Sequence, residues 1–578
     1  MRNSEQLSIS NYQLLMIDYR LGGELLLIIS NNIKNLLLGK FTMLNTLRFT
    51  IYCLLFTVYC LLITDNCSAQ SPAKYLITLK DKNNSPYSVS KPLEFLSQRS
   101  VNRRARQNIA VIARDLPVNP AYLAEIKKTG ANVWYSSRWM NAVMVECRDA
   151  VLQNILKLSF VKGLEVKGTI DNPLTRTKRK SAKFEALATD SFDYGIAKTQ
   201  VEMIGADQLH NQNFTGKGML IGVLDSGFQN ANTIAGLKSL FDSKRIIGTY
   251  DFVKRAILAY KDDDHGTGVL SCMAANLPGS LIGTAPDASY LLLRTEDDAS
   301  EYIIEEANWL FGAEYADSVG VDMINSSLGY TEFDDISTSH TYAQLDGNTT
   351  IAARAADWAA AAGIVCIVSA GNDGQAAWRY ISTPADADSV IAVGSVDARG
   401  VYALSSSQGN PDDKRIKPDL VALGQSAVTI DPQNGRVTTG SGTSFSCPIL
   451  CGMVACYWQA NPNLTAFQVI DNLRKSGSQY AKPDYVLGYG IPNFYRDNSK
   501  LFIVYPNPSN REINVKMTNF DSLNYKVTLI DMYGRVHWVE NLVSATQTFF
   551  VEKLTAGIYF LRVGNGEKND VVKVVIMK

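Results

Sequence analysis

The sequence lacks the features that mark several common protein classes. It contains no internal repeat and no low-complexity tract, and its nine cysteines form no C-x-x-C pair or other metal-ligand pattern. The formal net charge is zero and no nucleic-acid-reading motif is present. These absences argue against a metal-binding cysteine site, against an essential disulfide framework and against a nucleic-acid-binding protein.

Histidine is also scarce, with His210, His265, His340 and His537 only. A general base that works near neutral pH is most often histidine, so the candidates can be compared one by one. His537 falls in the C-terminal β-rich region, His210 in a polar loop before the first core strand, and His340 in the polar stretch 334–341. His265 opens a His-Gly-Thr-Gly sequence at the predicted start of an apolar helix, and it is therefore the candidate base.

Charge is distributed unevenly along the 578 residues, a length that predicts two to four domains. Lysine, arginine, aspartate and glutamate sum to +1 over residues 1–70, +12 over 71–180 and −13 over 181–578. A basic segment that precedes an acidic body favours an intramolecular partnership between the two.

The N-terminus carries an apolar run of 15 residues at 49–63, between Arg48 and the small residues 67–69. This pattern is typical of a secretory signal peptide rather than of a membrane span. The best positively charged start begins at Met43, which is a candidate true start; the alternative is an extended leader. Residues 1–69 are therefore interpreted as leader and signal peptide.

Residues 70–191 are predicted to be a small α+β pro-segment with a basic linker. Its expected elements are strands at 75–79 and 142–145 and helices at 92–107 and 120–128. The linker at 175–181, Thr-Arg-Thr-Lys-Arg-Lys-Ser, is either a solvated tether or a processing site between a pro-segment and a mature enzyme. The second reading also explains the charge asymmetry.

Residues 192–498 alternate apolar strands, such as 219–224 and 364–368, with helical stretches such as 351–362. This predicts an α/β fold whose parallel sheet has helices on both faces, with the ligand crevice at the carboxyl ends of the strands. Residues 499–578 show short strands and turn signals, and they predict a small β-sandwich domain without catalytic residues.

Three further side chains complete a candidate site. Ser444 lies in the small-residue stretch 440–444 before an apolar helix, where a base could activate it as a nucleophile. Asp225 ends an apolar strand and could orient His265, although an aspartate there can equally cap a turn. Asn372 follows strand 364–368 and could donate its amide to an oxyanion, although Asn between glycines is usually a turn residue.

The order Asp225, His265, Asn372, Ser444 and the surrounding motifs resemble the subtilisin-like serine peptidases (subtilases). The resemblance implies that Ser444 attacks a peptide carbonyl, His265 transfers the proton, Asp225 orients His265, and Asn372 with the Ser444 amide stabilises the oxyanion. It further implies that the edge formed by Ser327, Leu328 and Gly329 binds an extended substrate. The stretch 331–350 resembles an added loop.

The resemblance implies that the chemistry needs no cofactor. It is compatible with a structural calcium ion. The acidic stretches 262–264 and 296–298 are also typical of solvated faces, and no metal ligands are named. Motifs at 504–508, 529–535 and 554–561, followed by Lys573, resemble the type A sorting domain of the type IX secretion system. This implies export across the outer membrane of a Gram-negative bacterium, with release or attachment at the surface.

Two other functions fit parts of the sequence. An α/β-hydrolase esterase would need G-x-S-x-G and a histidine after the serine, whereas Ser446 occupies the second glycine position and His537 alone follows Ser444. A non-catalytic cell-surface binding protein on a peptidase scaffold is the stronger alternative. Because a candidate nucleophile, base, orienting acid and oxyanion donor are all present, we expect a secreted serine endopeptidase made as a zymogen. Its pro-segment would be the inhibitor and polypeptides the substrates.

Overall fold

A computed structural model describes residue 54 and residues 72–168, 192–410, 413–495, 501–517, 525–566 and 569–577. Of the compact unit Met1–Ser71 it describes Leu54 alone, so the fold below is that of the unit Pro72–Lys578. The predicted signal peptide, apart from Leu54, and the basic linker 175–181 lie outside the described residues. Within the described part of the chain, no helix has both the length and the apolar character needed to cross a bilayer.

The pro-segment forms a four-stranded antiparallel sheet in the order β2-β3-β1-β4. Its elements are β1 (Ala73–Leu79), η1 (Pro92–Glu94), α3 (Gln98–Arg106), η2 (Ala113–Asp115), α4 (Pro120–Lys128), β2 (Asn132–Ser137), β3 (Ala142–Cys147), α5 (Asp149–Leu156) and β4 (Val161–Gly168). The helix predicted at 92–107 is interrupted. The Ser97 side chain accepts a hydrogen bond from the Ser100 amide and caps a new helix there, whereas the helix predicted at 120–128 has the expected bounds.

The centre of the chain is a seven-stranded sheet in the order β13-β12-β11-β10-β5-β9-β6, in which every neighbouring pair is parallel. This confirms the predicted α/β fold. Its strands are β5 (Leu220–Asp225), β6 (Ile246–Asp251), β9 (Ser289–Arg294), β10 (Met323–Ser326), β11 (Val365–Ser369), β12 (Ile391–Val396) and β13 (Leu420–Leu423).

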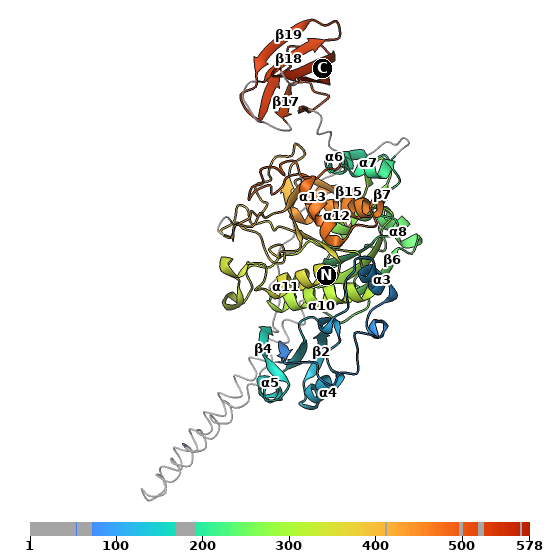
Figure 1. Cartoon of the computed structure of the whole chain (residues 1–578), viewed down its shortest axis with the longest axis vertical. Coiled ribbons are helices and arrows are strands. Elements are labelled where there is room, and N and C mark those ends of the chain that lie inside the picture. The colour runs from blue at the N-terminus through green and yellow to red at the C-terminus, as the bar shows by residue number, and fades with distance from the viewer. Residues whose placement is uncertain are drawn as a thin grey trace, which may run out of the picture. The chain divides into compact units, whose positions relative to one another are not determined.

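Helices cover both faces of this sheet because alternate strand residues point to opposite sides. Ile221 and Val223 enter the core formed with α9 (His265–Ala274) and α12 (Thr443–Ala460). The intervening residues Leu220 and Leu224 enter the core on the other face, which contains side chains of α10 (Ile304–Val319) and α11 (Ile351–Ala361). The last two helices lie side by side (Figure 1).

Smaller elements complete this region. They are η3 (Gly195–Ala197), α6 (Lys198–Met203), α7 (Ala206–Asn211), η4 (Ala235–Leu237), α8 (Lys238–Asp242), β7 (Asn276–Leu277), β8 (Leu281–Ile282), η5 (Ile336–Thr338), η6 (Tyr342–Gln344), β14 (Ala427–Ile430), β15 (Val437–Gly440) and α13 (Ala466–Lys475). Strands β14 and β15 form a hairpin that leads directly into the stretch containing Ser444.

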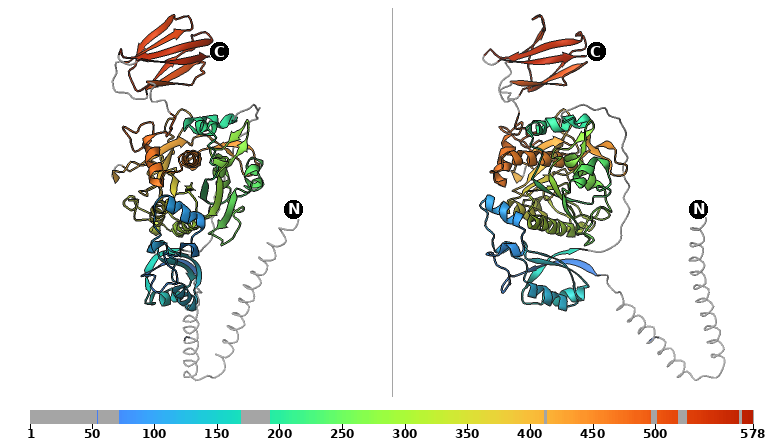
Figure 2. Two further views of the ribbon diagram at one scale, coloured as in Figure 1. Left: turned by 45° about the vertical axis from the view of Figure 1, so that its right-hand side comes forward. Right: turned by 90° about the vertical axis from the view of Figure 1, so that its right-hand side faces the viewer.

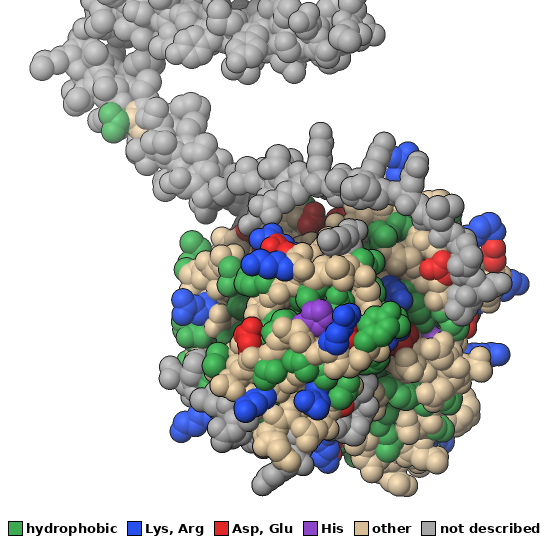
Figure 3. All heavy atoms as spheres, turned by 90° about the horizontal axis from the view of Figure 1, so that it is seen from above, with side chains coloured by type: hydrophobic (Ala, Val, Ile, Leu, Met, Phe, Trp, Pro, Cys, Tyr) green, Lys and Arg blue, Asp and Glu red, His purple; other side chains and the backbone are tan. Residues whose placement is uncertain are grey.

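The C-terminal region forms two antiparallel sheets, β16-β17-β20 and β19-β18-β21-β22, around one apolar core. Its strands are β16 (Phe502–Tyr505), β17 (Glu512–Met517), β18 (Lys526–Asp531), β19 (Val536–Asn541), β20 (Thr546–Phe550), β21 (Gly557–Gly564) and β22 (Asn569–Ile576). This agrees with the predicted small β-sandwich. In the view of Figure 3, basic and acidic side chains lie among apolar and polar ones and adjoin each other in several places.

The pro-segment packs on the helices of the second face. Leu76, Trp139 and Met144 share a core with residues of α10 and α11, and Figure 2 shows the blue sheet beneath these helices. Arg103 of α3 forms an ion pair with Asp317 of α10, and both side chains are fully buried. Opposite charges on pro-segment and body therefore meet, as the charge asymmetry predicts.

Candidate active site

Asp225 and His265 are joined at the carboxyl end of the sheet. Asp225 is the last residue of β5, His265 is the first residue of α9, and His265 Nδ1 lies 2.7 Å from Asp225 Oδ1. Asp225 is fully buried, and its Oδ1 also accepts the Ser226 amide at 3.0 Å. Burial of a carboxylate is unfavourable unless it is hydrogen-bonded, so the pair holds the imidazole in one orientation.

Gly266 allows this close approach of helix and strand. A Cβ at this position would lie 2.5 Å from the Gly227 carbonyl oxygen and 2.9 Å from the Asp225 Cβ. Any larger residue would push α9 away from β5, so the glycine after His265 is a packing requirement of the pair.

The charge of Asp225 changes the basicity of His265. Burial of the ring lowers its pKa, but the charge of Asp225 and the hydrogen bond to it outweigh that effect and raise the pKa of His265 to about 9. Asp263 and Glu296 raise it further. The imidazole is thus a stronger base than a free histidine.

Ser444 is the second residue of α12, which begins after Gly442. The first backbone N–H groups of a helix have no partner inside it, and the helix dipole favours negative charge at this end. The Ser444 hydroxyl lies 3.4 Å from the Ser327 carbonyl oxygen, and no hydrogen bond joins it to His265 among the described residues. The ring centroids of His265 and of Phe445, the residue after Ser444, are 6.3 Å apart.

Pro448 links this serine to the substrate-edge segment. A proline has no N–H, so the carbonyl of the residue four positions earlier, Ser444, loses its donor within α12. The Ser327 hydroxyl replaces that donor and lies 3.0 Å from the Ser444 carbonyl oxygen. The predicted segment Ser327, Leu328 and Gly329, which follows β10, is therefore attached directly to the nucleophile-bearing turn.

Asn372 lies beside the same turn. Its side-chain oxygen accepts the Thr443 amide at 2.8 Å and the Thr443 hydroxyl at 3.2 Å. Its amide nitrogen, a donor, has no hydrogen-bond partner among the residues that the structure describes. The backbone of Gly442 has a φ of +144°, and a Cβ there would lie 3.3 Å from the Asn372 side-chain oxygen. Glycine at position 442 therefore adopts this positive φ without strain and leaves room for the Asn372 side chain.

The remaining histidines are structural. His210 was expected in a polar loop, but it lies on α7, fully buried, with Nδ1 2.8 Å from the Tyr194 hydroxyl and Nε2 3.1 Å from the Thr284 carbonyl. His340 Nε2 and the Glu306 carboxylate form a buried hydrogen bond, which fastens the loop 331–350 to α10. His537 lies in the C-terminal sandwich, on β19.

The carboxylates of the acidic stretch 262–264 bind other residues of the protein. Asp262 pairs with Lys254, Asp263 accepts the Ser226 hydroxyl, and Asp264 accepts the Gln433 amide. A calcium ion prefers roughly six to eight oxygen ligands, so a stretch engaged in this way does not fit one. The second stretch contains Glu296, which does converge with two other carboxylates.

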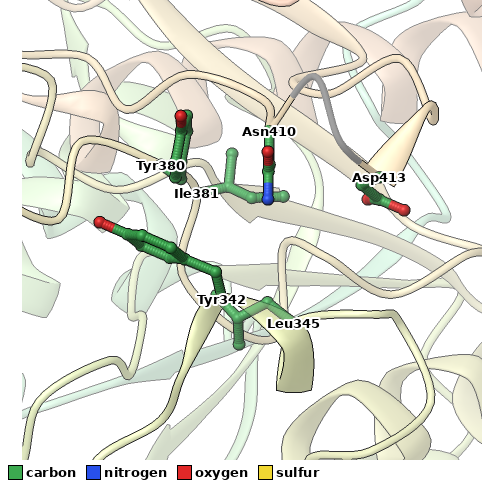
Figure 4. Close-up of a pocket in the computed structure, with 6 residues that line it drawn as sticks. All are labelled: Tyr342, Leu345, Tyr380, Ile381, Asn410 and Asp413. Atoms are coloured by element: carbon green, nitrogen blue, oxygen red, sulfur yellow. The ribbon is translucent and has the colours of Figure 1, made fainter.

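A small surface pocket lies apart from the predicted residues in sequence. It is lined by Tyr342, Leu345, Tyr380, Ile381, Asn410 and Asp413 (Figure 4). None of these is a predicted site residue, and the lining combines aromatic rings with few polar groups.

Sequence reasoning named Ser327 only as part of the substrate edge and did not find the supporting roles of its neighbours. The Ser327 hydroxyl, the Thr443 amide and hydroxyl, and the missing side chain of Gly266 all position the predicted groups. Pro448 was the available signal, because a proline four residues after Ser444 frees a carbonyl that needs a new donor.

Three family models match the chain. Residues 74–185 match the peptidase S8 propeptide domain of Bacteroidota, residues 216–490 match the subtilase family, and residues 503–577 match the secretion system C-terminal sorting domain. The sorting domain indicates type IX secretion to the extracellular or cell-surface space.

Two named subtilisins agree with the subtilase match. Subtilisin DY of Bacillus licheniformis is 29% identical over 296 residues, which cover 51% of this chain and 95% of that protein. Subtilisin E of Bacillus subtilis (strain 168) is 27% identical over 332 residues, or 56% of this chain and 78% of that protein. The crystal structure of MycP1 from the ESX-1 type VII secretion system has a TM-score of 0.40 and 21% identity, covering 54% of this chain and 89% of that one.

Fold, strand-end residues and family matches thus agree. The chain is a subtilisin-like hydrolase, in which a peptidase domain of the subtilase family follows a Bacteroidota peptidase S8 propeptide domain and precedes a C-terminal secretion sorting domain.

Proposed function

We propose that this protein is a secreted serine endopeptidase that cleaves peptide bonds through Asp225, His265 and Ser444. The hydrogen bond of 2.7 Å between His265 Nδ1 and Asp225 Oδ1 carries the proposal, because it leaves Nε2 as the basic atom. The position of Ser444 at a helix start, tied to Ser327, supports its role as nucleophile.

In the proposed reaction, Ser444 Oγ attacks the peptide carbonyl carbon while its proton passes to His265 Nε2. The Asn372 amide and the Ser444 backbone N–H stabilise the oxyanion, and the carbon–nitrogen bond breaks as His265 returns the proton to the leaving amine. Water then hydrolyses the acyl-enzyme with His265 again as base. Peptide main chain binds along Ser327, Leu328 and Gly329.

The proposal includes a division of the chain. Residues 1–69 are leader and signal peptide, 70–191 the pro-segment and linker, 192–498 the peptidase domain and 499–578 the sorting domain. The buried contacts of Arg103, Leu76 and Trp139 with α10 and α11 support a pro-segment that inhibits the peptidase until it is cut off. No cofactor enters the chemistry.

A serine-reactive fluorophosphonate probe tests the function. Processed wild-type protein should be labelled at Ser444, and Ser444→Ala should abolish labelling while the fold, measured by circular dichroism, is retained. His265→Ala should slow labelling on the order of 10⁴-fold or more. Equal labelling of wild type and His265→Ala would favour the alternative, a non-catalytic binding protein on a peptidase scaffold.

A further inference from the structure

The C-terminal sandwich, red in Figure 1, has two sheets with different outer faces. In an antiparallel sheet of this kind, alternate residues of each strand enter the core, and the residues between them meet solvent and are usually polar. The three-stranded sheet β16-β17-β20 follows this rule. Most of its outward residues are polar; they are Ile503, Tyr505, Glu512, Asn514, Lys516, Thr546, Thr548 and Phe550.

The four-stranded sheet β19-β18-β21-β22 breaks the rule. Leu529, Leu561 and Val574 enter the core, so the residues that alternate with them face outward. Many of these outward residues are apolar. The side chains that are 37 to 55% exposed are Val536, Val539, Ile558, Phe560 and Val571, and those of Ile530 and Val575 are partly exposed. The outer face of this sheet is therefore largely apolar although it meets solvent.

The apolar side chains of this face form a continuous row across the strands. Val536 of β19 is paired with Ile530 of β18, and Ile530 is paired with Phe560 of β21. Phe560 is paired in turn with Lys573 of the edge strand β22. Directly opposite residues have Cβ atoms about 5 Å apart, so these side chains adjoin one another. A contiguous exposed apolar patch of this kind marks an interaction surface.

A cation lies inside the patch. In the adjacent row, Thr528 of β18 is paired with Val539 of β19 and with Arg562 of β21. Arg562 is paired on its other side with Val571 of β22. The guanidinium group thus belongs to a central strand, and its neighbours in the row are a valine and a threonine.

The charged residues of this outer face are all positive. They are Lys526, Arg562 and Lys573, and none of them takes part in the ion pairs described in the sandwich. The acidic residues of the same strands are in register with core residues instead; they are Asp531, Glu540 and Asp570. The face therefore offers apolar contact and cations, without a carboxylate of its own among the described strands.

We propose that the outer face of the sheet β19-β18-β21-β22 is the surface through which the sorting domain binds a protein of the secretion system. The match of residues 503–577 to a secretion system C-terminal sorting domain supplies the kind of partner. Charge complementarity supplies its chemistry: the partner presents an apolar surface with carboxylates opposite Arg562 and Lys573. The proposal does not depend on the peptidase function.

A second copy of this chain does not complement the face. In a two-fold dimer the same surface meets itself, so the cations of both copies would share an interface to which neither face brings a carboxylate. A lipid bilayer does not complement it either. Hydrocarbon offers no acceptor to Arg562, whereas a carboxylate accepts two N–H bonds from one guanidinium group.

Export of the full-length chain tests the proposal. The Ser444→Ala chain is produced in a Bacteroidota host with a working type IX secretion system, and an antibody to the peptidase domain measures the amounts outside the cell and in the periplasm. Arg562→Glu combined with Lys573→Glu should lower the export rate at least about tenfold, the effect of one lost charge-assisted contact. Arg511→Glu combined with Lys553→Glu makes the same change in charge outside this face and should be exported like the parent.

A second pair of variants tests the apolar part of the face. Val539→Thr combined with Val571→Thr keeps side chains that suit a strand and removes two methyl groups from the interface, so export should fall about tenfold. Ile503→Thr on the outer face of the three-stranded sheet is the control and should not change export. Thermal unfolding of each purified chain verifies the fold. If the charge-reversed chain does not fold, the threonine variant decides. Export at the parent's rate in the folded variants overturns the proposal.

Two measurements on the purified Ser444→Ala chain separate the other occupants. Sedimentation velocity should show a monomer; a dimer that the charge reversal dissociates would assign the face to a second copy. Vesicles of phosphatidylethanolamine and phosphatidylglycerol should not bind the chain; binding that the charge reversal abolishes would assign the face to the membrane. Either result overturns the proposal, as does retention of the parent chain in a host that exports its own sorting-domain proteins.

Discussion

Arg103 of the pro-segment and Asp317 of α10 form an ion pair in which neither side chain is exposed to solvent. Arg104 and Arg138 bind the same carboxylate, so three pro-segment arginines surround one aspartate of the peptidase domain. A buried pair of this kind adds little stability compared with apolar residues, but the loss of one partner leaves an unpaired buried charge. The arrangement therefore makes pro-segment docking sensitive to a single side chain.

Replacement of Asp317 by asparagine should destabilise the precursor strongly. The fully buried Arg103 would lose its counter-charge, and Arg104 would keep only its pair with Asp115, so the expected loss in the free energy of unfolding is about 3 to 5 kcal/mol. Urea denaturation of the full-length Ser444→Ala precursor measures it. Glu125→Gln is the matched control, since Glu125 pairs with Lys128 on the exposed surface of the pro-segment and its loss should cost about 1 kcal/mol or less.

Acid should affect this interface only at very low pH. Burial by itself would raise the pKa of Asp317. The charges of Arg103, Arg138 and Arg104 outweigh that effect and lower the pKa to about 2. A carboxylate whose pKa is lowered on folding stabilises the fold above its unfolded value, near 3.8, and that contribution disappears as the pH falls through about 2. Denaturation midpoints of the precursor at pH 5 and 7 should therefore show no loss from Asp317; a marked fall between them that Asp317→Asn abolishes would contradict this.

The rate of peptide hydrolysis should rise with pH through the alkaline range. The base must be neutral to accept the Ser444 proton, and the pKa of His265 is raised to about 9, so protonation suppresses kcat/KM below that value. A pH profile of kcat/KM on a peptide substrate without ionisable side chains measures the midpoint.

Asp225→Asn should move this midpoint to lower pH. The variant keeps the burial that lowers the pKa of His265 and removes the charge that raises it. The plateau rate should fall on the order of 10⁴-fold, because the orienting carboxylate is lost. An unchanged midpoint in the variant would show that Asp225 does not set the basicity of His265.

Asn372→Ala should lower kcat by about 10²- to 10³-fold with little change in KM. The lost amide donates to the oxyanion, a charge that exists in the transition state and not in bound substrate. Steady-state kinetics provide the test. Gln433→Ala, which removes an exposed amide bonded to Asp264, is the control and should keep wild-type kcat. A parallel rise in KM would instead indicate a substrate-binding role.

Ser327→Ala should destabilise the nucleophile turn through the Ser444 carbonyl. That buried oxygen would lose its donor at a cost of about 1 to 3 kcal/mol. Pro448→Ala in the same chain restores a helical N–H four residues after Ser444, so the double variant should recover part of the lost Tm. Thermal unfolding of the two variants compares them. Without any recovery, the hydrogen bond would not be the reason for the loss.

The sequence predicted the regular elements well where local signals were strong. The helix at 120–128 begins at a proline and ends as expected, and strand 219–224 is displaced by one residue so that Asp225 closes β5. The helix at 92–107 was divided because Ser97 provides an internal cap, a competing signal that apolar periodicity does not register. The buried His210 was misplaced because its partners, Tyr194 and Thr284, come from outside its own segment.

The sequence alone determined the order of the chemical groups, the α/β alternation, the charge difference between pro-segment and body, and the family resemblance. These properties are local or compositional, so they can be read without knowing which strands are neighbours. The tertiary structure decided which groups meet. Only the strand order β10-β5-β9 brings the Ser327 edge, Asp225 and Glu296 to one crevice, because adjacency in a parallel sheet joins residues distant in the chain.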